Sequence, residues 1–238
     1  MLYEFAGFVF DLKFHYDFSL KMCEQYVYTG DKLPDYTIDI PAEVSERIAK
    51  NSAVDFCVGN FEFLEVYREI CKILCDKGYM FMHCSSIAYK GNGILFTAPS
   101  GTGKSTHSAL WKRHFGEDVV IVNDDKPLLH ITPDVIEVCG TPWDGKHKRS
   151  ANISAPIKSI VILSQGSENK IEKATKQEAF YTILNQTIRA MDKNLMTLVL
   201  DMVERLLDRV PVYKLSCTIS DEAVMTVFET IKEYFDED

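Results

Sequence analysis

Residues 95–111 have the sequence LFTAPSGTGKSTHSALW, in which an apolar segment, a turn rich in glycine and serine, and a helical pattern follow one another. Glycine and other small residues let the backbone turn tightly and direct successive N–H groups at one point. A helix that starts directly after such a loop adds the attraction of its N-terminal dipole for anions. This order of strand, loop and helix predicts a binding loop for the phosphates of a nucleoside triphosphate.

The loop itself, APSGTGKS at Ala98–Ser105, matches the phosphate-loop (Walker A) pattern G-x-x-x-x-G-K-[ST] except for its first residue, an alanine. In this pattern the lysine reaches the β- and γ-phosphates and the following hydroxyl coordinates Mg²⁺. The alanine methyl group is compatible with the loop if the backbone keeps a negative φ there. The residues predicted to contact the nucleotide are Ser100, Gly101, Thr102, Gly103, Lys104, Ser105 and Thr106. Ser105 is predicted to bind the metal as well.

A second motif, VVIVNDD at residues 119–125, ends a run of apolar residues on two acids. Such a run predicts a buried strand that carries carboxylates to its C-terminal edge, where a nucleotide site holds its metal. We predict that Asp124 binds Mg²⁺, directly or through water, and that Asp125 accepts the proton of an attacking hydroxyl. The alternative interpretation is an ordinary turn formed by Asn123-Asp124-Asp125.

The rest of the chain alternates extended and helical patterns, which predicts an α/β domain. Extended segments are expected over Phe8–Phe14, Tyr36–Ile40, Met80–Lys90, Gly93–Ala98, Asp118–Asp124, Ile157–Gly166 and Val210–Cys217. Helices are expected over Ala42–Lys50, Phe61–Lys77, Lys104–Phe115, Lys176–Met191, Asn194–Asp208 and Asp221–Phe235. The turn Gly91-Asn92-Gly93 predicts a hairpin before the phosphate loop. We expect one domain over residues 1–238, in which a β/helix segment, 1–79, packs on a core of residues 80–238.

The composition excludes several classes of function. A net charge of −9 leaves no excess of lysine and arginine to neutralise a nucleic-acid backbone. No apolar run has the length of a membrane span, and the acidic residues of the opening MLYEFAGFVFDLKF are unlike a signal peptide. Seven cysteines without a CxxC pair indicate neither a disulfide framework nor a zinc site. We therefore expect a cytoplasmic protein with no nucleic-acid or membrane partner.

Taken in order, these motifs resemble the catalytic domain of bacterial HPr kinase/phosphorylase, whose nucleotide site is similar to that of phosphoenolpyruvate carboxykinase. The resemblance covers roughly residues 80–165 and is carried by His83-Cys84 in a first strand, the Gly-Asn-Gly turn, SGTGKS and VNDDKP. It implies a P-loop-containing mixed sheet flanked by helices. The roles that it implies are phosphate and metal binding for Lys104 and Ser105, metal binding for Asp124, general base for Asp125, and a place beside that base for His83.

A basic run, Lys146-His147-Lys148-Arg149, interrupts this acidic chain. A phosphoryl-transfer site needs cations near the transferring group, and arginine supplies a planar fork of donors. We predict a catalytic role for Arg149, with Lys146 as the alternative, against the simpler interpretation of a solvated loop. The family resemblance also gives Glu137 a part in metal binding, although Cys139 stands where the family has arginine.

The motifs together predict an ATP- and Mg²⁺-dependent kinase that transfers the γ-phosphoryl group to a hydroxyl. The acceptor is expected to be a serine of a peptide or protein, or a small metabolite. Two alternatives stay open: a nucleotide-binding regulator that transfers nothing, and an enzyme similar to phosphoenolpyruvate carboxykinase. The latter would need a second metal centre with His and Lys ligands, for which the sequence has no obvious set. Oligomeric state is not indicated by these residues.

Overall fold

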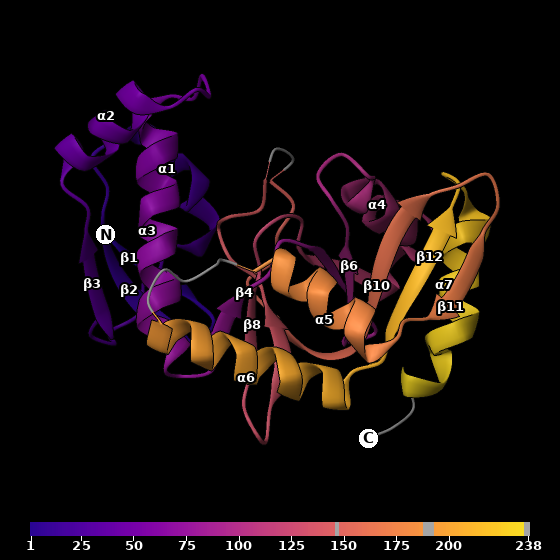
Figure 1. Cartoon of the computed structure of the whole chain (residues 1–238). Helices are drawn as coiled ribbons and strands as arrows, with labels where there is room; N and C mark the ends of the chain where they lie inside the picture. Colours follow the sequence, from indigo (N-terminus) through magenta and orange to yellow (C-terminus); the bar gives the residue numbers. More distant parts are fainter. Residues whose placement is uncertain (146–147, 188–192, 236–238) are drawn as a thin grey trace. The chain divides into compact units, whose positions relative to one another are not determined.

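A computed structural model of the chain describes residues 1–145, 148–187 and 193–235. The chain forms two compact units, Met1–Leu74 and Cys75–Asp238 (Figure 1). Two features considered above lie outside the described residues: Lys146-His147 of the basic run, and residues 188–191 at the end of a predicted helix. No helix among the described residues is both long and apolar enough to cross a bilayer.

The first unit, all of whose residues are described, combines a small sheet with helices. Its elements are β1 (Leu2–Phe5), β2 (Phe8–Lys13), α1 (Asp17–Met22), a 3-10 turn η1 (Glu24–Tyr26), β3 (Tyr36–Asp39), α2 (Ala42–Asn51) and α3 (Val58–Cys75). Strands β1 and β2 pair antiparallel, and β2 and β3 pair parallel. The sequence predicted β2, β3, α2 and α3, whereas the short elements β1 and α1 were not predicted.

Aromatic rings fill the core of the first unit. Tyr3, Phe5 and Phe10 are fully buried, and the rings of Phe5 and Phe10 stack with their centroids 4.6 Å apart. The buried carboxylate of Glu62 on α3 accepts hydrogen bonds from the His15 backbone N–H at 2.6 Å and from the hydroxyl of Ser19 at 2.5 Å. Burying a carboxylate without hydrogen-bond donors costs free energy of folding, so these bonds favour the folded state. They also connect α3 to the segment that follows β2.

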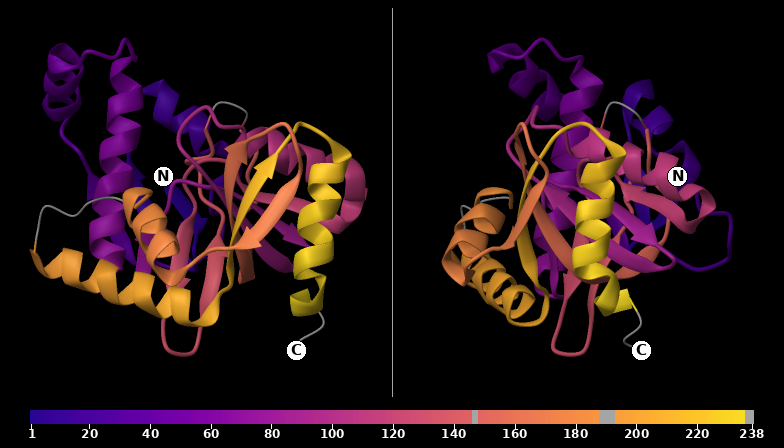
Figure 2. Two further views of the ribbon diagram at one scale, coloured as in Figure 1. Left: turned by 45° about the vertical axis from the view of Figure 1, so that its right-hand side comes forward. Right: turned by 90° about the vertical axis from the view of Figure 1, so that its right-hand side faces the viewer.

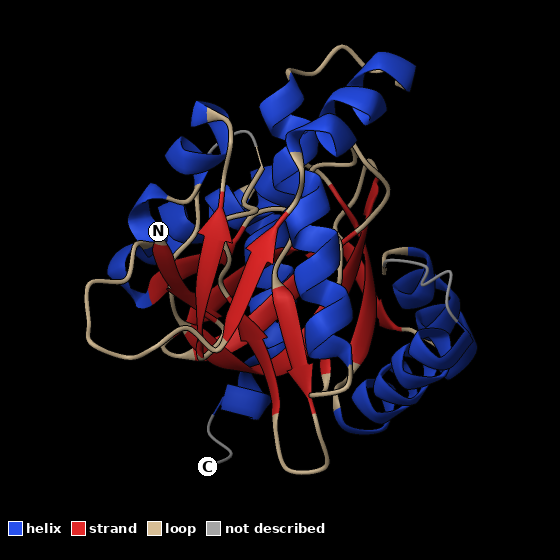
Figure 3. Cartoon of the chain, turned by 90° about the vertical axis from the view of Figure 1, so that its left-hand side faces the viewer, coloured by secondary structure: helices blue, strands red, loops and turns tan. Residues whose placement is uncertain are grey.

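The second unit is a mixed sheet flanked by helices. Its strands are β4 (Tyr79–Phe81), β5 (Ser85–Tyr89), β6 (Asn92–Thr97), β7 (Val119–Asn123), β8 (Leu128–Ile131), β9 (Ile136–Cys139), β10 (Ser154–Gln165), β11 (Lys170–Lys173) and β12 (Val212–Cys217). Its helices are α4 (Lys104–Phe115), α5 (Lys176–Asn185), α6 (Lys193–Arg209) and α7 (Asp221–Ile231), with 3-10 turns η2 (Gly116–Asp118) and η3 (Lys232–Phe235). The described strands follow the order β4-β8-β9-β10-β6-β5-β7, with β12 beside β10 and β11 beside β12. Figure 3 shows the strands of the chain in red and its helices in blue.

The central strands of this sheet bury side chains on both faces. Leu95 of β6 and Ile160 of β10 belong to a core cluster with residues of α5 and α6, whereas Phe96 and Val161, their neighbours along the two strands, pack with residues of α4 and α7. Successive side chains of a strand point to opposite faces, so uninterrupted apolar runs suit strands covered on both sides. Figure 2 accordingly shows α5 and α6 on one side of the sheet and α7 on the other.

The predicted hairpin is confirmed, but the strand expected over residues 80–90 is wrong. Strands β5 and β6 pair antiparallel around a turn in which Lys90 and Gly91 have positive φ. The segment before them is divided: β4 pairs with β8, while β5 pairs with β6 and β7. His83 lies between β4 and β5, because its backbone N–H donates to the carbonyl of Gln186 at 2.7 Å instead of to a strand.

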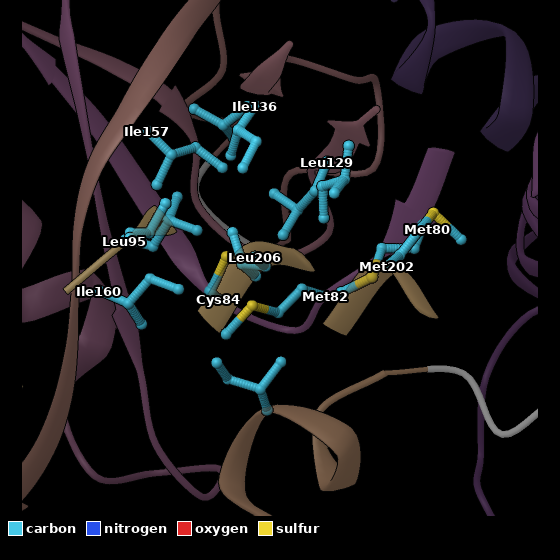
Figure 4. Packing of buried hydrophobic residues seen from close by; sticks show 14 of the residues in the cluster. Met80, Met82, Cys84, Leu95, Leu129, Ile136, Ile157, Ile160, Met202 and Leu206 are labelled. Carbon is cyan, nitrogen blue, oxygen red and sulfur yellow. The ribbon is translucent and has the colours of Figure 1, made fainter. Parts of the chain in front are cut away.

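Other elements of the second unit follow the sequence closely. Helices α4, α6 and α7 and strands β7, β10 and β12 lie where their patterns predicted them, within a few residues. Helix α5 ends earlier than expected, at Asn185, and β8, β9 and β11 were not predicted. Cys84 packs among the apolar side chains of the core, including Met82 and Leu206 (Figure 4), so it serves as a small core residue. The predicted mixed sheet flanked by helices is confirmed.

Candidate functional site

The glycine-rich loop connects β6 to α4, in the strand–loop–helix order that its sequence predicted. Gly101 and Gly103 have φ of +81° and +118°, a backbone region that residues with a Cβ rarely adopt. Ala98 is not among the described residues of positive φ, and its methyl group is buried in the core beside Phe96. Alanine is therefore compatible with the first position of the loop, as the sequence predicted.

Lys104 begins α4 and is 94% buried, with 6% of its surface exposed. Its Nζ donates to the carbonyl of Ala98 at 2.9 Å and to that of Pro99 at 3.5 Å, so the ammonium lies against the inside of the loop. Burial lowers the pKa of Lys104, while the negative charges of Asp125 and Asp124 act in the opposite direction. A cation is thus held within the electrostatic reach of both predicted acids.

The two acids follow β7 on a turn made by Asn123. The Asn123 Oδ1 accepts hydrogen bonds from the backbone N–H of Asp125 at 2.9 Å and of Lys126 at 2.7 Å. Its Nδ2 donates to the carbonyl of Thr141 at 2.9 Å, which holds the buried asparagine in place. The turn considered as the alternative interpretation does form, and this turn presents the two carboxylates at the end of the strand.

Asp124 is buried, and its carboxylate is linked by hydrogen bonds to two serine hydroxyl groups. The Ser85 hydroxyl donates to Asp124 Oδ1 at 2.6 Å and lies 2.6 Å from the hydroxyl of Ser108. These residues come from β5, α4 and the end of β7, and α4 is the helix that follows the glycine-rich loop. The carboxylate is therefore fixed relative to the helix that carries Lys104.

Asp125 pairs with His83, as the family resemblance implied. The His83 Nε2 lies 3.2 Å from Asp125 Oδ1, and Lys126 forms an ion pair with the other carboxylate oxygen. Burial alone would raise the pKa of Asp125, but the hydrogen bond from His83 and the charge of Lys126 outweigh it and lower that pKa. Asp125 is consequently ionised at neutral pH.

Gln186, which the sequence did not indicate, holds His83 from its other side. The Gln186 carbonyl accepts the His83 backbone N–H, and its side-chain Oε1 lies 3.1 Å from His83 Nδ1. The two residues are 103 positions apart. No local pattern could have indicated Gln186, because its position depends on how α5 packs on the sheet.

The loop over residues 140–151, of which 140–145 and 148–151 are described, approaches the end of β7. Its Ser150 forms an isolated bridge with Asn123, and Ser150 also donates a hydrogen bond to the buried Asp144 at 2.9 Å. Burial raises the pKa of Asp144 to about 6, and the nearby charge of Asp124 adds to this effect. Asp144 is a third carboxylate near the acid pair; its sequence neighbourhood, Trp143-Asp144-Gly145, carries no signal that separates it from a surface acid.

The remaining candidates lie apart from the acid pair or at its margin. Arg149 is exposed, next to Ser150 in the loop just described. Glu137 lies on β9 opposite His130, with its Oε1 3.3 Å from His130 Nδ1, and its predicted part in metal binding stays a prediction. Ser100 of the loop and Thr106 of α4 are exposed, and Ser105 of α4 is half-exposed.

Substituting Gly140 by alanine is expected to destabilise the second unit by about 2–3 kcal/mol. A Cβ at this position would lie 1.8 Å from the carbonyl oxygen of Ala151 and 2.9 Å from that of Val122. Both are backbone atoms, so β7 or the loop would have to move. Urea denaturation would measure the change, and an unchanged midpoint for Gly140→Ala would contradict this packing.

The residues at this site fit Mg²⁺ that is also bound by phosphate and water oxygens better than they fit a metal whose ligands all come from the protein. Within the described residues, no group of three or more His, Cys, Asp or Glu side chains is arranged to hold a metal ion. Mg²⁺ is commonly held by one or two carboxylates together with phosphate and water oxygens. The buried carboxylate of Asp124 and the hydroxyl of Ser105, in the first turn of α4, are oxygen donors that fit this chemistry.

Comparison with known proteins identifies a family and, among solved structures, weak similarity. No curated protein matches the chain. One solved structure with such similarity is the Hpr(Ser) kinase/phosphatase from Coxiella burnetii. The match covers 65% of this chain and 95% of the Coxiella chain, with 13% sequence identity and a TM-score of 0.35. A similarity at this level assigns no activity to the present chain. The model of the family described as "SynChlorMet cassette protein ScmC" matches residues 55–232, more than half of the chain. The chain therefore belongs to the ScmC family.

Proposed function

We propose that the second unit binds ATP with Mg²⁺ and transfers the γ-phosphoryl group to a hydroxyl, that of a serine in a peptide or protein or of a small metabolite. The observation that carries this proposal is the burial of Lys104 within electrostatic reach of Asp124 and Asp125, directly behind the glycine-rich loop. A phosphoryl-transfer site requires such a combination, because it must neutralise the phosphates and also position an attacking oxygen.

Each group has a role that follows from its surroundings. The backbone N–H groups of the loop and the Lys104 ammonium would bind the phosphates, with Lys104 exchanging its loop carbonyls for phosphate oxygens. Asp124 and Ser105 would hold Mg²⁺, which when bound neutralises phosphate charge. Arg149 would supply a further cation from the loop over residues 140–151.

Asp125 would act mainly by orienting the hydroxyl. Its lowered pKa makes it a weak base, yet keeps it ionised and ready to accept a hydrogen bond from the acceptor. Phosphoryl transfer proceeds through a loose transition state, so little proton transfer to the base is needed before the new bond forms. His83 would hold the carboxylate in place through its 3.2 Å contact, and Gln186 would hold His83.

Binding of a non-hydrolysable ATP analogue is expected to require Mg²⁺, with affinity falling at least about tenfold when EDTA removes the metal, because the phosphate charge is then less neutralised. Isothermal titration calorimetry measures this directly. A transfer assay with γ-³²P-ATP against serine peptides, hydroxy acids and sugars would then identify the acceptor class. Binding that is equally tight with and without Mg²⁺ would contradict the assignment of Asp124 and Ser105.

The alternatives predict different results in the same experiments. A nucleotide-binding regulator would bind the analogue and label no acceptor in any panel. An enzyme similar to phosphoenolpyruvate carboxykinase would consume oxaloacetate and need a transition metal besides Mg²⁺. The pairing of Asp125 with His83 favours transfer over mere binding, since a regulator has no need of an oriented carboxylate beside the phosphates.

A further inference from the structure

A pocket of about 560 Å³ lies beside the glycine-rich loop, within the second unit. The loop over Gly101–Gly103 and the first turns of α4 form one wall, and the ends of β10 and β12 form the other. Its volume is within the range of small-molecule sites, and it shares its wall with the loop proposed to bind phosphates. A ligand in this pocket would therefore be continuous with a phosphate chain on the loop.

We propose that this pocket holds the purine ring of the nucleotide. It does so by contacts with the two faces of the ring, without hydrogen bonds to the polar atoms at the edge of the ring. The proposal rests on the proposed function, because it places the base of the same nucleotide. It adds a property that the phosphate loop alone does not confer: adenine and guanine nucleotides should bind about equally well.

The lining of the pocket suits a neutral ring. None of its lining residues is an acid, a lysine or an arginine. His107, which also lines it, is neutral: burial lowers its pKa to about 4. Its Nε2 accepts a hydrogen bond from the indole N–H of Trp111 at 3.2 Å, so the ring proton is on Nδ1. An anionic acceptor would find no compensating charge here, whereas an aromatic base needs none.

Apolar side chains face the pocket from both walls. Leu110 of α4 and Leu163 of β10 are almost completely buried beneath it, and they provide a fixed apolar floor. Ile219, after β12, lines the same pocket yet is 81% exposed. A large apolar side chain at a pocket rim loses its unfavourable exposure when a flat ring packs against it. The two leucines of the floor and Ile219 at the rim would therefore contact opposite faces of a flat ring.

Several polar groups on the β10 and β12 side of the lining are already hydrogen-bonded within the protein. The Thr218 backbone N–H and hydroxyl both donate to the Asn169 Oδ1, at 2.9 and 3.2 Å. The Gly166 backbone N–H donates to the Cys217 carbonyl at 3.0 Å, and the Gln165 side chain donates to the Thr102 carbonyl at 3.3 Å. Purines differ in their edges, not in their faces, so a wall on which these donors are engaged discriminates poorly between them.

The test compares nucleotides with inorganic tripolyphosphate in Mg²⁺ buffer, using the whole chain and displacement of a fluorescent mant-ATP. ATP and GTP are expected to bind within about fivefold of one another, and each at least about tenfold more tightly than tripolyphosphate. Ile219→Ser should remove most of that advantage while leaving the affinity for tripolyphosphate unchanged. Tyr181→Ser, which also shortens an exposed side chain of this unit, is the matched control and should change neither.

The outcomes separate this proposal from the one on which it rests. Tripolyphosphate binding as tightly as ATP would overturn the base pocket and leave the phosphate loop intact. No binding of either ligand would contradict the proposed function itself. A preference above about fiftyfold between ATP and GTP would show that the ring edge is read, and would overturn recognition by the faces.

Cys217 offers a second measurement that does not depend on a substitution. This half-buried thiol lines the pocket. Its alkylation by N-ethylmaleimide, followed by peptide mass spectrometry, should slow several-fold with ATP or GTP present and stay unchanged with tripolyphosphate. Cys57, exposed in the first unit, provides the internal reference for the reagent. Equal protection of Cys217 by tripolyphosphate would contradict a base in the pocket.

Discussion

Asp125→Asn is expected to lower phosphoryl transfer by about 10²–10⁴-fold while leaving nucleotide affinity within a few-fold of the unsubstituted protein. The amide keeps the size of the side chain but cannot accept a proton, and it loses the charge that pairs with His83 and Lys126. Turnover of the ³²P label to the acceptor, together with calorimetry of the ATP analogue, measures the two effects separately.

Asp208→Asn is the matched control for that substitution. Asp208 pairs with Lys176 on the surface of the same unit, and its side chain is 60% exposed. Removing an exposed ion pair costs little, so transfer by this variant should be unchanged. If Asp125→Asn retains its turnover, the assignment of Asp125 as the group that orients the hydroxyl is wrong, whereas loss of nucleotide binding would point to a role at the phosphates.

Lys104→Met is expected to abolish measurable nucleotide-dependent transfer, with a fall in kcat/KM of about 10²–10³-fold or more. Methionine fills a similar volume along the loop but carries no charge, whereas the buried Lys104 ammonium lies within electrostatic reach of both acids. Because the lost interaction strengthens as charge develops on the transferred group, kcat should fall more than affinity.

Lys112→Met tests whether that effect is specific. Lys112 lies on the same helix, and its ammonium also donates to a backbone carbonyl, that of Val119, at 2.8 Å. The substitution therefore removes an equivalent charge and an equivalent hydrogen bond from α4 outside the glycine-rich loop. Equal losses for the two variants would mean that Lys104 acts by stabilising the helix and not by binding phosphate. Circular dichroism of both variants checks the fold.

The conformation of the glycine-rich loop was predictable because its determinants are local. Positive φ at Gly101 and Gly103 is tied to glycine itself, and the helix that begins at Lys104 follows from the sequence immediately after the loop. Strand β7 was equally predictable, since an apolar run that ends on Asn and Asp needs only a buried environment and a turn to form. Each of these features depends on residues a few positions apart.

The strand expected through His83 shows where such patterns fail. The largely apolar run over residues 80–90 is compatible with one long strand, yet the chain divides it between partners on different parts of the sheet. The division depends on the backbone hydrogen bond from His83 to Gln186, a residue far along the chain. Local propensity cannot encode a partner at that distance.

The sequence by itself determined the mixed sheet, the glycine-rich loop and the acids that end β7, because backbone conformation and alternation of apolar residues are properties of neighbouring residues. Only the tertiary structure decided which groups meet at the acid pair. His83 from the β4–β5 connection, Gln186 from the end of α5 and Asp144 from the loop over residues 140–151 converge there. Their convergence results from packing both faces of one sheet, which brings together residues that no spacing along the chain relates.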